Sequence, residues 1–226
     1  WNKMGAGLGI KYRNSDGDSR LCSTGGVVTK GSTYYVLTAG HCTVDASSPI
    51  YQWNGQLGVR HPNFNSIPSG FDVGLIIPSN SSLSRYAYNG LLMNTALGSV
   101  SDYGGNIKST RGYTVLNQTV CKTGATTGYT CGKVTKVGHT LPSGLVVSIA
   151  EKEPSQGFLA GSGDSGGAVT DANNYFTGLV QGGSPAVQDE NGSYYGYNMF
   201  FTRWGDFGPR YDLNFYTSSS QTLMPN

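Results

Sequence analysis

The sequence predicts an all-β fold. Only 12% of the residues are Asp, Glu, Lys or Arg, about half of the roughly 25% that is usual in globular domains. The chain also contains 34 glycines and 15 tyrosines. Helix-forming surface residues are therefore scarce, whereas turn residues and side chains that suit a half-buried strand are common. A chain of 226 residues can form one large β-domain or two small ones that pack together.

Short runs rich in β-branched and aromatic residues recur along the chain, and turn residues separate them. Each run has the length of a strand, and the spacing of the runs is typical of a barrel or a sandwich. An Asn-Gly dipeptide at positions 191 and 192 predicts a hairpin turn. Some helical character is confined to residues 86–97 and 212–223. The predicted strands are residues 7–12, 26–29, 33–38, 72–77, 113–116, 145–149, 168–170, 175–180 and 197–202.

The chain divides best near its middle. A stretch at residues 99–110 contains several glycines and serines and separates two strand-rich halves. We therefore expect an N-terminal domain at residues 1–105 and a C-terminal domain at residues 106–226.

Charge and hydropathy exclude two classes of partner. The formal net charge is +2, and basic residues do not cluster or alternate with aromatics, which speaks against nucleic acid. No run of 18 apolar residues is present, which speaks against a membrane span. The chain begins at Trp1 without a signal peptide, so we expect a mature form from which a leader and a pro-segment were removed.

Four cysteines lie at positions 22, 42, 121 and 131, and three pairings are possible. Joining Cys22 to Cys42 and Cys121 to Cys131 keeps each bridge within one half of the chain. A loop of about 20 residues closed in this way contributes roughly 3 kcal/mol. Free buried thiols and a metal site are the alternatives, but no CxxC spacing supports a metal. Disulfides indicate an oxidising compartment, so we expect a secreted protein.

A glycine-rich turn at residues 161–167, Gly-Ser-Gly-Asp-Ser-Gly-Gly, stands directly before a predicted strand. Its glycines permit unusual backbone angles and close approach of a substrate. Ser165 in such a turn can present its hydroxyl while neighbouring N–H groups point at the same place, as a nucleophile for acyl transfer requires. A plain surface turn is the alternative interpretation.

A serine hydroxyl is a weak nucleophile at neutral pH and needs a base, and His41 is the candidate. It follows the apolar segment 34–37 and precedes Cys42. A neutral imidazole with a pKa near 6.5 can accept the serine proton and return it to the leaving group. Taken alone, His41 would fit a packed structural histidine better than a base. His61 and His139 lie in polar segments and are interpreted as loop residues.

The imidazole in turn needs a buried carboxylate that holds its tautomer and stabilises its charged form. Asp72 stands at the head of the apolar run 73–77. A carboxylate in that position is costly to bury unless it is paired. The other aspartates lie in polar or turn-like contexts, so Asp72 is the candidate partner of His41.

Three motifs now stand in order along the chain: Thr-Ala-Gly-His41-Cys, Asp72-Val-Gly-Leu-Ile and Gly163-Asp-Ser165-Gly-Gly. Together they resemble the catalytic signatures of the chymotrypsin-like serine peptidases. Residues 120–132 resemble the bacterial branch that contains alpha-lytic protease and the streptogrisins. The resemblance implies two antiparallel β-barrels with the active site in the cleft between them. It also implies that the N–H groups of Gly163 and Ser165 form the oxyanion hole.

Two positions depart from the family pattern. The bacterial branch has an arginine that pairs with the aspartate before the nucleophile, and this chain has Lys122 there. We therefore expect Lys122 to pair with Asp164, although lysine offers no planar fork. Gln181 stands where the family usually has a serine that supports the catalytic aspartate, which here is Asp72.

The resemblance also indicates which residues bind substrate. The residue six before the nucleophile sets the charge of the specificity pocket in the family, and here it is uncharged. We expect cleavage after uncharged apolar or aromatic residues, because no acid stands at the pocket base and no histidine follows His139. The predicted substrate-binding residues are Leu159, Gln181, Gly182, Gly183 and Met199.

We therefore expect a secreted, monomeric serine endopeptidase that acts through an acyl-enzyme and needs no metal or organic cofactor. Its partners would be protein or peptide substrates, its own pro-segment or protein inhibitors. Two other classes remain as alternatives. One is a catalytically inactive binding protein of the same fold, and the other is an extracellular β-lectin, which would leave the three motifs unexplained.

Overall fold

The computed structural model describes residues 2–44, 46, 49–52, 55–79, 84–93 and 103–224. Strands dominate these residues, as the sequence predicts. The helices among them are the short α1 (His41–Val44), α2 (Trp204–Phe207) and the 3-10 turns η1 (Ile67–Ser69) and η3 (Pro154–Gln156). No helix in the described ranges has the length and apolarity needed to cross a bilayer.

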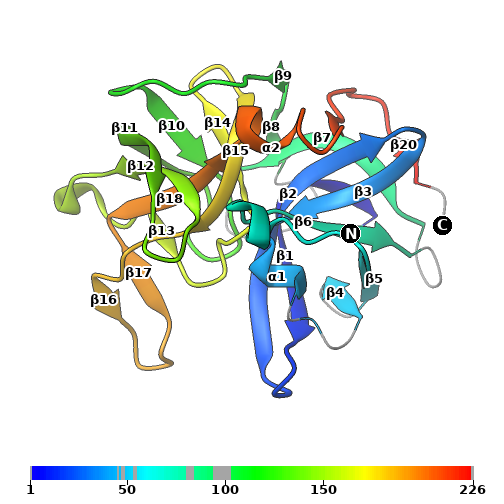
Figure 1. Ribbon diagram of the computed structural model, residues 1–226, viewed down its shortest axis with the longest axis horizontal. Helices are drawn as coiled ribbons and strands as arrows, with labels where there is room; N and C mark the ends of the chain where they lie inside the picture. The colour runs from blue at the N-terminus through cyan, green and yellow to red at the C-terminus, as the bar shows by residue number, and fades with distance from the viewer. Residues whose placement is uncertain are drawn as a thin grey trace.

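The first half of the chain forms a closed barrel. Strand β1 pairs with both β2 and β4, so the order β2-β3-β6-β5-β4-β1 returns to its start (Figure 1). Further strands extend this sheet beyond β1 and β2. The strands of the sheet are β1 (Lys3–Arg13), β2 (Ser19–Lys30), β3 (Thr33–Thr38), β4 (Ile50–Gln52), β5 (Gly55–Arg60), β6 (Gly74–Pro78), β7 (Tyr86–Leu92), β8 (Tyr103–Asn106), β19 (Asn214–Phe215) and β20 (Thr222–Leu223).

The second half closes in the same way, because β14 pairs with both β10 and β15. A separate small sheet, in the order β13-β17-β16, projects from this half (Figure 1). The strands of the larger sheet are β9 (Ser109–Thr110), β10 (Thr119–Lys122), β11 (Thr130–Thr140), β12 (Val146–Glu151), β14 (Ala168–Asp171), β15 (Tyr175–Gly182) and β18 (Asn198–Arg203). The small sheet consists of β13 (Ala160–Gly161), β16 (Val187–Gln188) and β17 (Tyr194–Gly196).

A shared apolar cluster joins the two barrels. It combines buried side chains of the first barrel, such as Leu37 and Leu75, with Phe176 and Leu179 of the second. Burial of such side chains stabilises the contact by about 1.5–3 kcal/mol each. The cluster therefore packs the strands of the first barrel that carry candidate site residues against those of the second.

Most predicted strands are confirmed, with ends that differ by a few residues. Residues 113–116 are wrong as a strand: they form irregular backbone, and the side chain of Tyr113 is 63% exposed. The expected helical character is also wrong where the structure describes it, because residues 86–92 form β7 and residues 212–223 contain β19 and β20. Residues 94–97 of the first stretch lie outside the described residues. Each of these strands finds an open edge of the first sheet, which outweighs its local preference.

The division at residues 105 and 106 stays a prediction. The boundary falls inside β8, and residues 99–102 of the expected linker lie outside the described residues. The chain also returns to the first sheet at β19 and β20. The C-terminal segment therefore packs partly against the N-terminal barrel.

Two disulfides are present, and they follow the local pairing. Cys22 in β2 is bonded to Cys42 in α1, and Cys121 is bonded to Cys131 across β10 and β11. The first bridge anchors the short helix that begins at His41, so it ties that residue to the barrel wall.

Candidate active site

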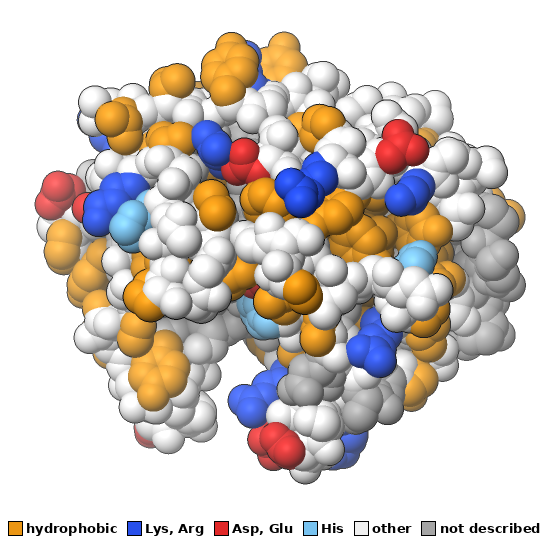
Figure 2. All heavy atoms as spheres, viewed as in Figure 1, with side chains coloured by type: hydrophobic (Ala, Val, Ile, Leu, Met, Phe, Trp, Pro, Cys, Tyr) orange, Lys and Arg blue, Asp and Glu red, His pale blue; other side chains and the backbone are white. Residues whose placement is uncertain are grey.

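A notch opens on one side of the molecule between the β1–β2 hairpin and the small β13-β17-β16 sheet (Figures 1 and 2). The first of these projections belongs to the first barrel and the second to the other barrel. A chain bound in this notch would therefore contact both halves of the protein.

His41 and Asp72 meet because neighbouring strands end side by side. Thr38 at the end of β3 pairs with Gly74 at the start of β6. The Nδ1 atom of His41 lies 2.6 Å from Oδ2 of Asp72, and the His41 backbone N–H donates to Oδ1 at 2.7 Å. Asp72 is only 3% exposed, so both carboxylate oxygens are held inside the protein. A Cβ at Gly40 would lie 2.8 Å from Oδ1, so the turn needs glycine there.

The His41 side chain is 44% exposed. Desolvation by the surrounding protein lowers its pKa, but the hydrogen bond to Asp72 and the negative charge of that carboxylate raise it by more. The net pKa of His41 therefore lies above its ordinary value of 6.5. The imidazole is set up to accept a proton readily.

Ser66 positions the loop that carries Asp72, and the sequence analysis missed it. Its buried hydroxyl oxygen accepts the Val73 N–H at 2.8 Å, and its proton reaches the Phe71 carbonyl at 2.7 Å. These two bonds flank Asp72 on both sides. Ser66 lies in an ordinary polar stretch with no motif around it, so the sequence held no signal for this role.

Ser165 lies in the turn between β13 and β14, at the cleft between the barrels. Its Oγ donates to the backbone carbonyl of Gln181 at 3.0 Å. The described residues show no hydrogen bond between this hydroxyl and the His41 ring. The Ser165 carbonyl accepts the N–H of Ser23 from β2 at 2.7 Å, which fixes the turn against the first barrel.

The turn around Ser165 leaves two N–H groups available. The N–H groups of Asp164 and Gly166 donate to the carbonyls of Gly161 and Val180, at 3.0 and 2.7 Å. Those of Gly163 and Ser165 have no hydrogen-bond partner in the described part of the chain. Gly163 has φ +103°, a backbone angle that favours glycine. The two free donors are therefore those that the resemblance implies for an oxyanion hole.

Lys122 and Asp164 form a buried ion pair beneath this turn. Nζ of Lys122 lies 3.3 Å from Oδ2 of Asp164, and both side chains are 0% exposed. Lys122 also donates to the Gly128 carbonyl and the Thr127 hydroxyl, at 2.6 and 2.5 Å. Burial lowers the pKa of Lys122, and the nearby Asp164 carboxylate opposes this effect. The oxygens of Asp164 additionally accept the N–H groups of Thr126, Thr127 and Gly161.

Gln181 does not support Asp72. Its side-chain amide donates to the Thr202 hydroxyl at 2.5 Å, inside the second barrel. The carboxylate of Asp72 is held instead by the backbone and ring of His41. Gln181 therefore departs from the family pattern by bonding within the second barrel, and Asp72 still has hydrogen-bond partners.

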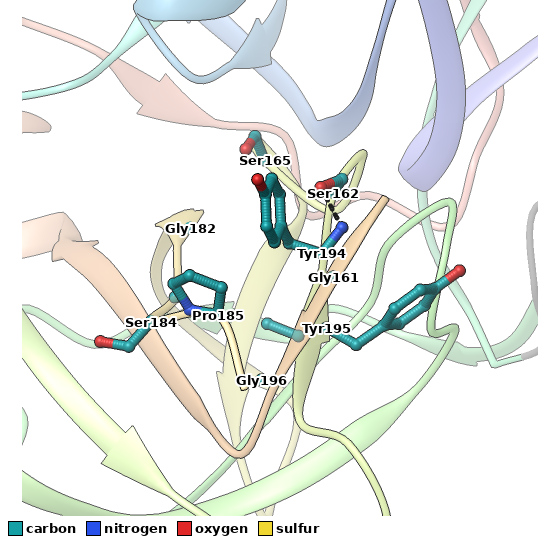
Figure 3. A pocket seen from close by; sticks show the side chains of 11 residues that line it. Gly161, Ser162, Ser165, Gly182, Ser184, Pro185, Tyr194, Tyr195 and Gly196 are labelled. Carbon is teal, nitrogen blue, oxygen red and sulfur yellow. Dashed lines mark hydrogen bonds between the residues drawn. The ribbon is translucent and has the colours of Figure 1, made fainter. Parts of the chain in front are cut away.

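A hollow of about 200 Å³ opens beside Ser165. In Figure 3, Tyr194 stands next to Ser165, whereas the ring of Tyr195 is turned away from the other labelled side chains. None of the lining residues carries a charge. They are Ala160, Gly161, Ser162, Ser165, Gly182, Gly183, Ser184, Pro185, Tyr194, Tyr195 and Gly196.

The predicted substrate-binding residues divide into two groups here. Gly182 and Gly183 line the hollow, and the backbone of Gln181 contacts Ser165. The side chains of Leu159 and Met199 do not line it: both are 0% exposed and belong to the core of the second barrel. Met199 lies in β18, where alternation directs its side chain into the core, and Leu159 stands just before β13 and packs into the same core.

The sequence analysis missed the tyrosines and Ala160 at this hollow. Ala160 and Gly196 pair across β13 and β17 and are the buried members of its lining. The Asn-Gly turn at positions 191 and 192 is present between β16 and β17, and it returns Tyr194 to the cleft. That turn was the signal that could have identified these residues.

One further cluster could suggest a metal. The ligand atoms of Cys22, His41 and Cys42 lie within 4.8 Å of one another. The two sulfurs are bonded to each other, so they offer no thiolate. This cluster therefore reflects the disulfide beside His41 and not a metal site.

The sequence matches the Trypsin family over residues 9–204. It is 34% identical over 174 residues to serine protease 2 of Streptomyces fradiae, a match that covers 72% of this chain and 87% of that protein. It is 32% identical to streptogrisin-A of Streptomyces griseus, which covers 74% of this chain but 49% of that protein.

Among solved structures, a glutamic-acid-specific serine protease that uses a histidine triad in substrate binding has a TM-score of 0.63. It shares 26% sequence identity, and the match covers 94% of this chain and all of that one. The family match, these relatives and the two closed barrels agree. The chain belongs to the trypsin family and is a serine endopeptidase of the bacterial, chymotrypsin-like kind.

Proposed function

We propose that this chain is a secreted endopeptidase in which Ser165, His41 and Asp72 cleave peptide bonds through an acyl-enzyme. One observation carries the proposal. The hydrogen-bonded His41–Asp72 pair stands across the cleft from a serine whose turn presents two free N–H donors. Nucleophilic acyl transfer needs a hydroxyl, a base and donors for the developing oxyanion.

In the proposed reaction, the Ser165 hydroxyl turns from the Gln181 carbonyl towards Nε2 of His41. Its oxygen attacks the scissile carbonyl while His41 accepts the proton. The N–H groups of Gly163 and Ser165 stabilise the oxyanion, and protonated His41 then donates to the departing amine. Water, deprotonated by the same imidazole, hydrolyses the ester. Asp72 holds the Nδ1–H tautomer and stabilises the imidazolium throughout.

The proposed substrates carry an uncharged apolar or aromatic residue before the cut. The hollow beside Ser165 is lined by glycine, serine, proline, alanine and tyrosine, so no lining charge would pair with Arg, Lys or Glu. The glutamic-acid-specific neighbour uses a histidine triad, whereas none of this chain's three histidines lines the hollow.

The proposal extends to location and partners. Two disulfides favour an oxidising environment outside the cell. We assign the notch between the two projections (Figure 2) to an extended bound chain: a substrate, a protein inhibitor or the protein's own pro-segment. We propose that the active form is a monomer, because one copy of the chain supplies the nucleophile, the base and the carboxylate.

A catalytically inactive binding protein is the competing function, and the site gives no support to it. A binding protein has no need for a buried carboxylate that holds an imidazole, nor for two unpaired N–H groups at the same place. Both features persist here.

Removing the nucleophile tests the proposal directly. We expect Ser165→Ala to lower turnover of a peptide substrate on the order of 10⁶-fold. A serine-directed peptidyl phosphonate should label the natural protein at Ser165 and leave the variant unlabelled, as measured by intact mass. Cleavage by an unlabelled natural protein would contradict the mechanism.

The pH profile tests the roles of His41 and Asp72. Because the pKa of His41 is raised, imidazolium persists above pH 6.5, and kcat/KM should rise with pH through a midpoint above that value. Asp72→Asn removes the charge that raises this pKa, so the midpoint should fall, and turnover should drop about 10⁴-fold. A profile that stays flat between pH 5 and 8 would count against His41 as the base.

Removing the buried cation tests the support beneath the turn. Lys122→Met leaves the Asp164 carboxylate buried without its partner, which should lower the free energy of unfolding by about 3–5 kcal/mol. Turnover should fall as well, because Asp164 precedes the nucleophile. Thermal denaturation and steady-state kinetics measure the two effects. Lys133→Met, at an exposed position of β11, is the control. Equal stability and equal turnover of the two variants would refute the role of Lys122 in supporting the turn.

Filling the hollow tests substrate preference. Ala160 is a buried lining residue, so Ala160→Leu should narrow the hollow and favour small side chains before the cut. We expect the ratio of kcat/KM for Phe over Ala substrates to fall by at least about tenfold. Ala172→Leu, at an exposed position after β14, is the control. An unchanged ratio would place the specificity pocket elsewhere.

A further inference from the structure

The peptide groups of the turn around Ser165 differ in how many hydrogen bonds hold them, and this difference points to a further positioning residue. The peptide between Gly163 and Asp164 is held at both ends: its carbonyl accepts the Ser23 hydroxyl at 2.7 Å and its N–H donates to Gly161. The peptide between Ser165 and Gly166 is also held at both ends, by Ser23 and Val180. Neither of these peptides can rotate without breaking two bonds.

The two peptides that supply the proposed oxyanion donors are hydrogen-bonded only through their carbonyl groups. The carbonyl of Asp164, which belongs to the peptide that carries the Ser165 N–H, accepts the Gly167 N–H at 2.9 Å. The carbonyl of Ser162, which belongs to the peptide that carries the Gly163 N–H, accepts the Thr126 hydroxyl at 2.5 Å. Because a trans peptide is planar, fixing its carbonyl on one side directs its N–H to the other.

The Gly163 peptide is the one that can turn over most easily. Rotation of this peptide changes ψ of Ser162 and φ of Gly163, and glycine accepts angles that other residues reject. The Thr126 bond is the one hydrogen bond that this peptide makes in the described part of the chain. The Asp164 carbonyl, by contrast, is held by another backbone group of the same turn.

Thr126 is well placed to hold this peptide. A Cβ at Gly163 would lie 2.5 Å from the Thr126 hydroxyl oxygen, so the two residues are in direct contact. The backbone N–H of Thr126 donates to Oδ1 of Asp164 at 2.9 Å, which ties its position to the buried Lys122–Asp164 pair. Ser162 is fixed separately, since its Oγ accepts the Tyr194 N–H at 3.0 Å (dashed in Figure 3).

We propose that Thr126 is a positioning residue that locks the 162–163 peptide, so that the Gly163 N–H points into the oxyanion hole. This inference rests on the proposed role of Gly163 as an oxyanion donor. Thr126 does not touch the reacting atoms and acts through the peptide that it holds. Its loss leaves the nucleophile, the base and the carboxylate in place.

The test compares Thr126→Val with Thr126→Ser. Valine keeps the branched shape and removes the hydroxyl, whereas serine keeps the hydroxyl. We expect Thr126→Val to lower kcat by at least about tenfold, up to the 10²–10³-fold that loss of one oxyanion donor costs. KM should change less than about twofold, because the Gly163 N–H that this bond orients stabilises the oxyanion of the transition state and not the bound substrate. Thr126→Ser should stay near the natural kcat.

Two readouts separate positioning from general damage. The midpoint of the pH profile should stay where it is in the natural protein, because the His41–Asp72 pair is untouched. Thr130→Val is the matched control, since the Thr130 hydroxyl also donates to a backbone carbonyl, that of Leu159, at 2.6 Å. It should retain kcat.

A peptide boronic acid supplies a measurement that does not depend on turnover. Ser165 Oγ adds to trigonal boron, its proton passes to His41, and the boronate hydroxyl occupies the oxyanion site. The Gly163 amide resonance in ¹H–¹⁵N spectra should move strongly on binding in the natural protein and in Thr126→Ser, but little in Thr126→Val. The inhibition constant for Thr126→Val should rise by the same factor as kcat/KM falls.

The outcomes are distinguishable. Natural kcat and a natural Gly163 shift in Thr126→Val would overturn the role of Thr126, while phosphonate labelling of Ser165 would still support the peptidase mechanism. Equal losses in the Ser and Val variants would also overturn it, because serine keeps the hydroxyl and the loss would then not follow the hydrogen bond to Ser162. Failure of the boronic acid and the phosphonate to react with the natural protein would overturn both proposals.

Discussion

The site depends on holding two separate barrels together to within the length of a hydrogen bond. His41 and Asp72 come from one barrel and Ser165 from the other, so neither barrel holds the candidate site alone. The shared apolar cluster supplies the attraction, but dispersion and hydrophobic contacts are not directional. Ser23 supplies direction: from β2 it donates its N–H to the Ser165 carbonyl and its hydroxyl to the Gly163 carbonyl.

This arrangement explains why the turn around Ser165 can leave donors unpaired. An N–H group without a partner is costly when buried, so it persists only where the surrounding bonds fix the backbone. Here the carbonyls of four successive residues, from Ser162 to Ser165, all accept hydrogen bonds. Because hydrogen bonds fix these carbonyls and each peptide is planar, the N–H groups of Gly163 and Ser165 can point in only one direction. Preorganisation of this kind is what stabilises a developing charge without rearrangement.

The sequence singled out the three candidate catalytic residues but not the residues that surround them. His41, Asp72 and Ser165 stand in motifs whose residue types the reaction demands, so few other arrangements could explain them. Ser66, Ser23 and Thr126 are hydroxyl residues in polar or strand contexts, and nothing local separates them from other such residues. Their roles appear only when distant segments meet. Leu159 and Met199 lie in the core of the second barrel and not at the hollow, because the direction in which a side chain points depends on how the sheet packs.

Lys122 shows how a departure from the family pattern can be absorbed. An arginine fork could satisfy both oxygens of Asp164 at once, whereas an ammonium group is a single point charge with three donors. In this protein, Oδ1 of Asp164 accepts the N–H groups of Thr126 and Thr127 instead. Lysine then needs to reach only Oδ2, and its remaining donors go to Thr127 and Gly128. The segment that compensates for the missing fork is also the one that carries Thr126, so one short loop supports both the buried charge and the proposed oxyanion donor.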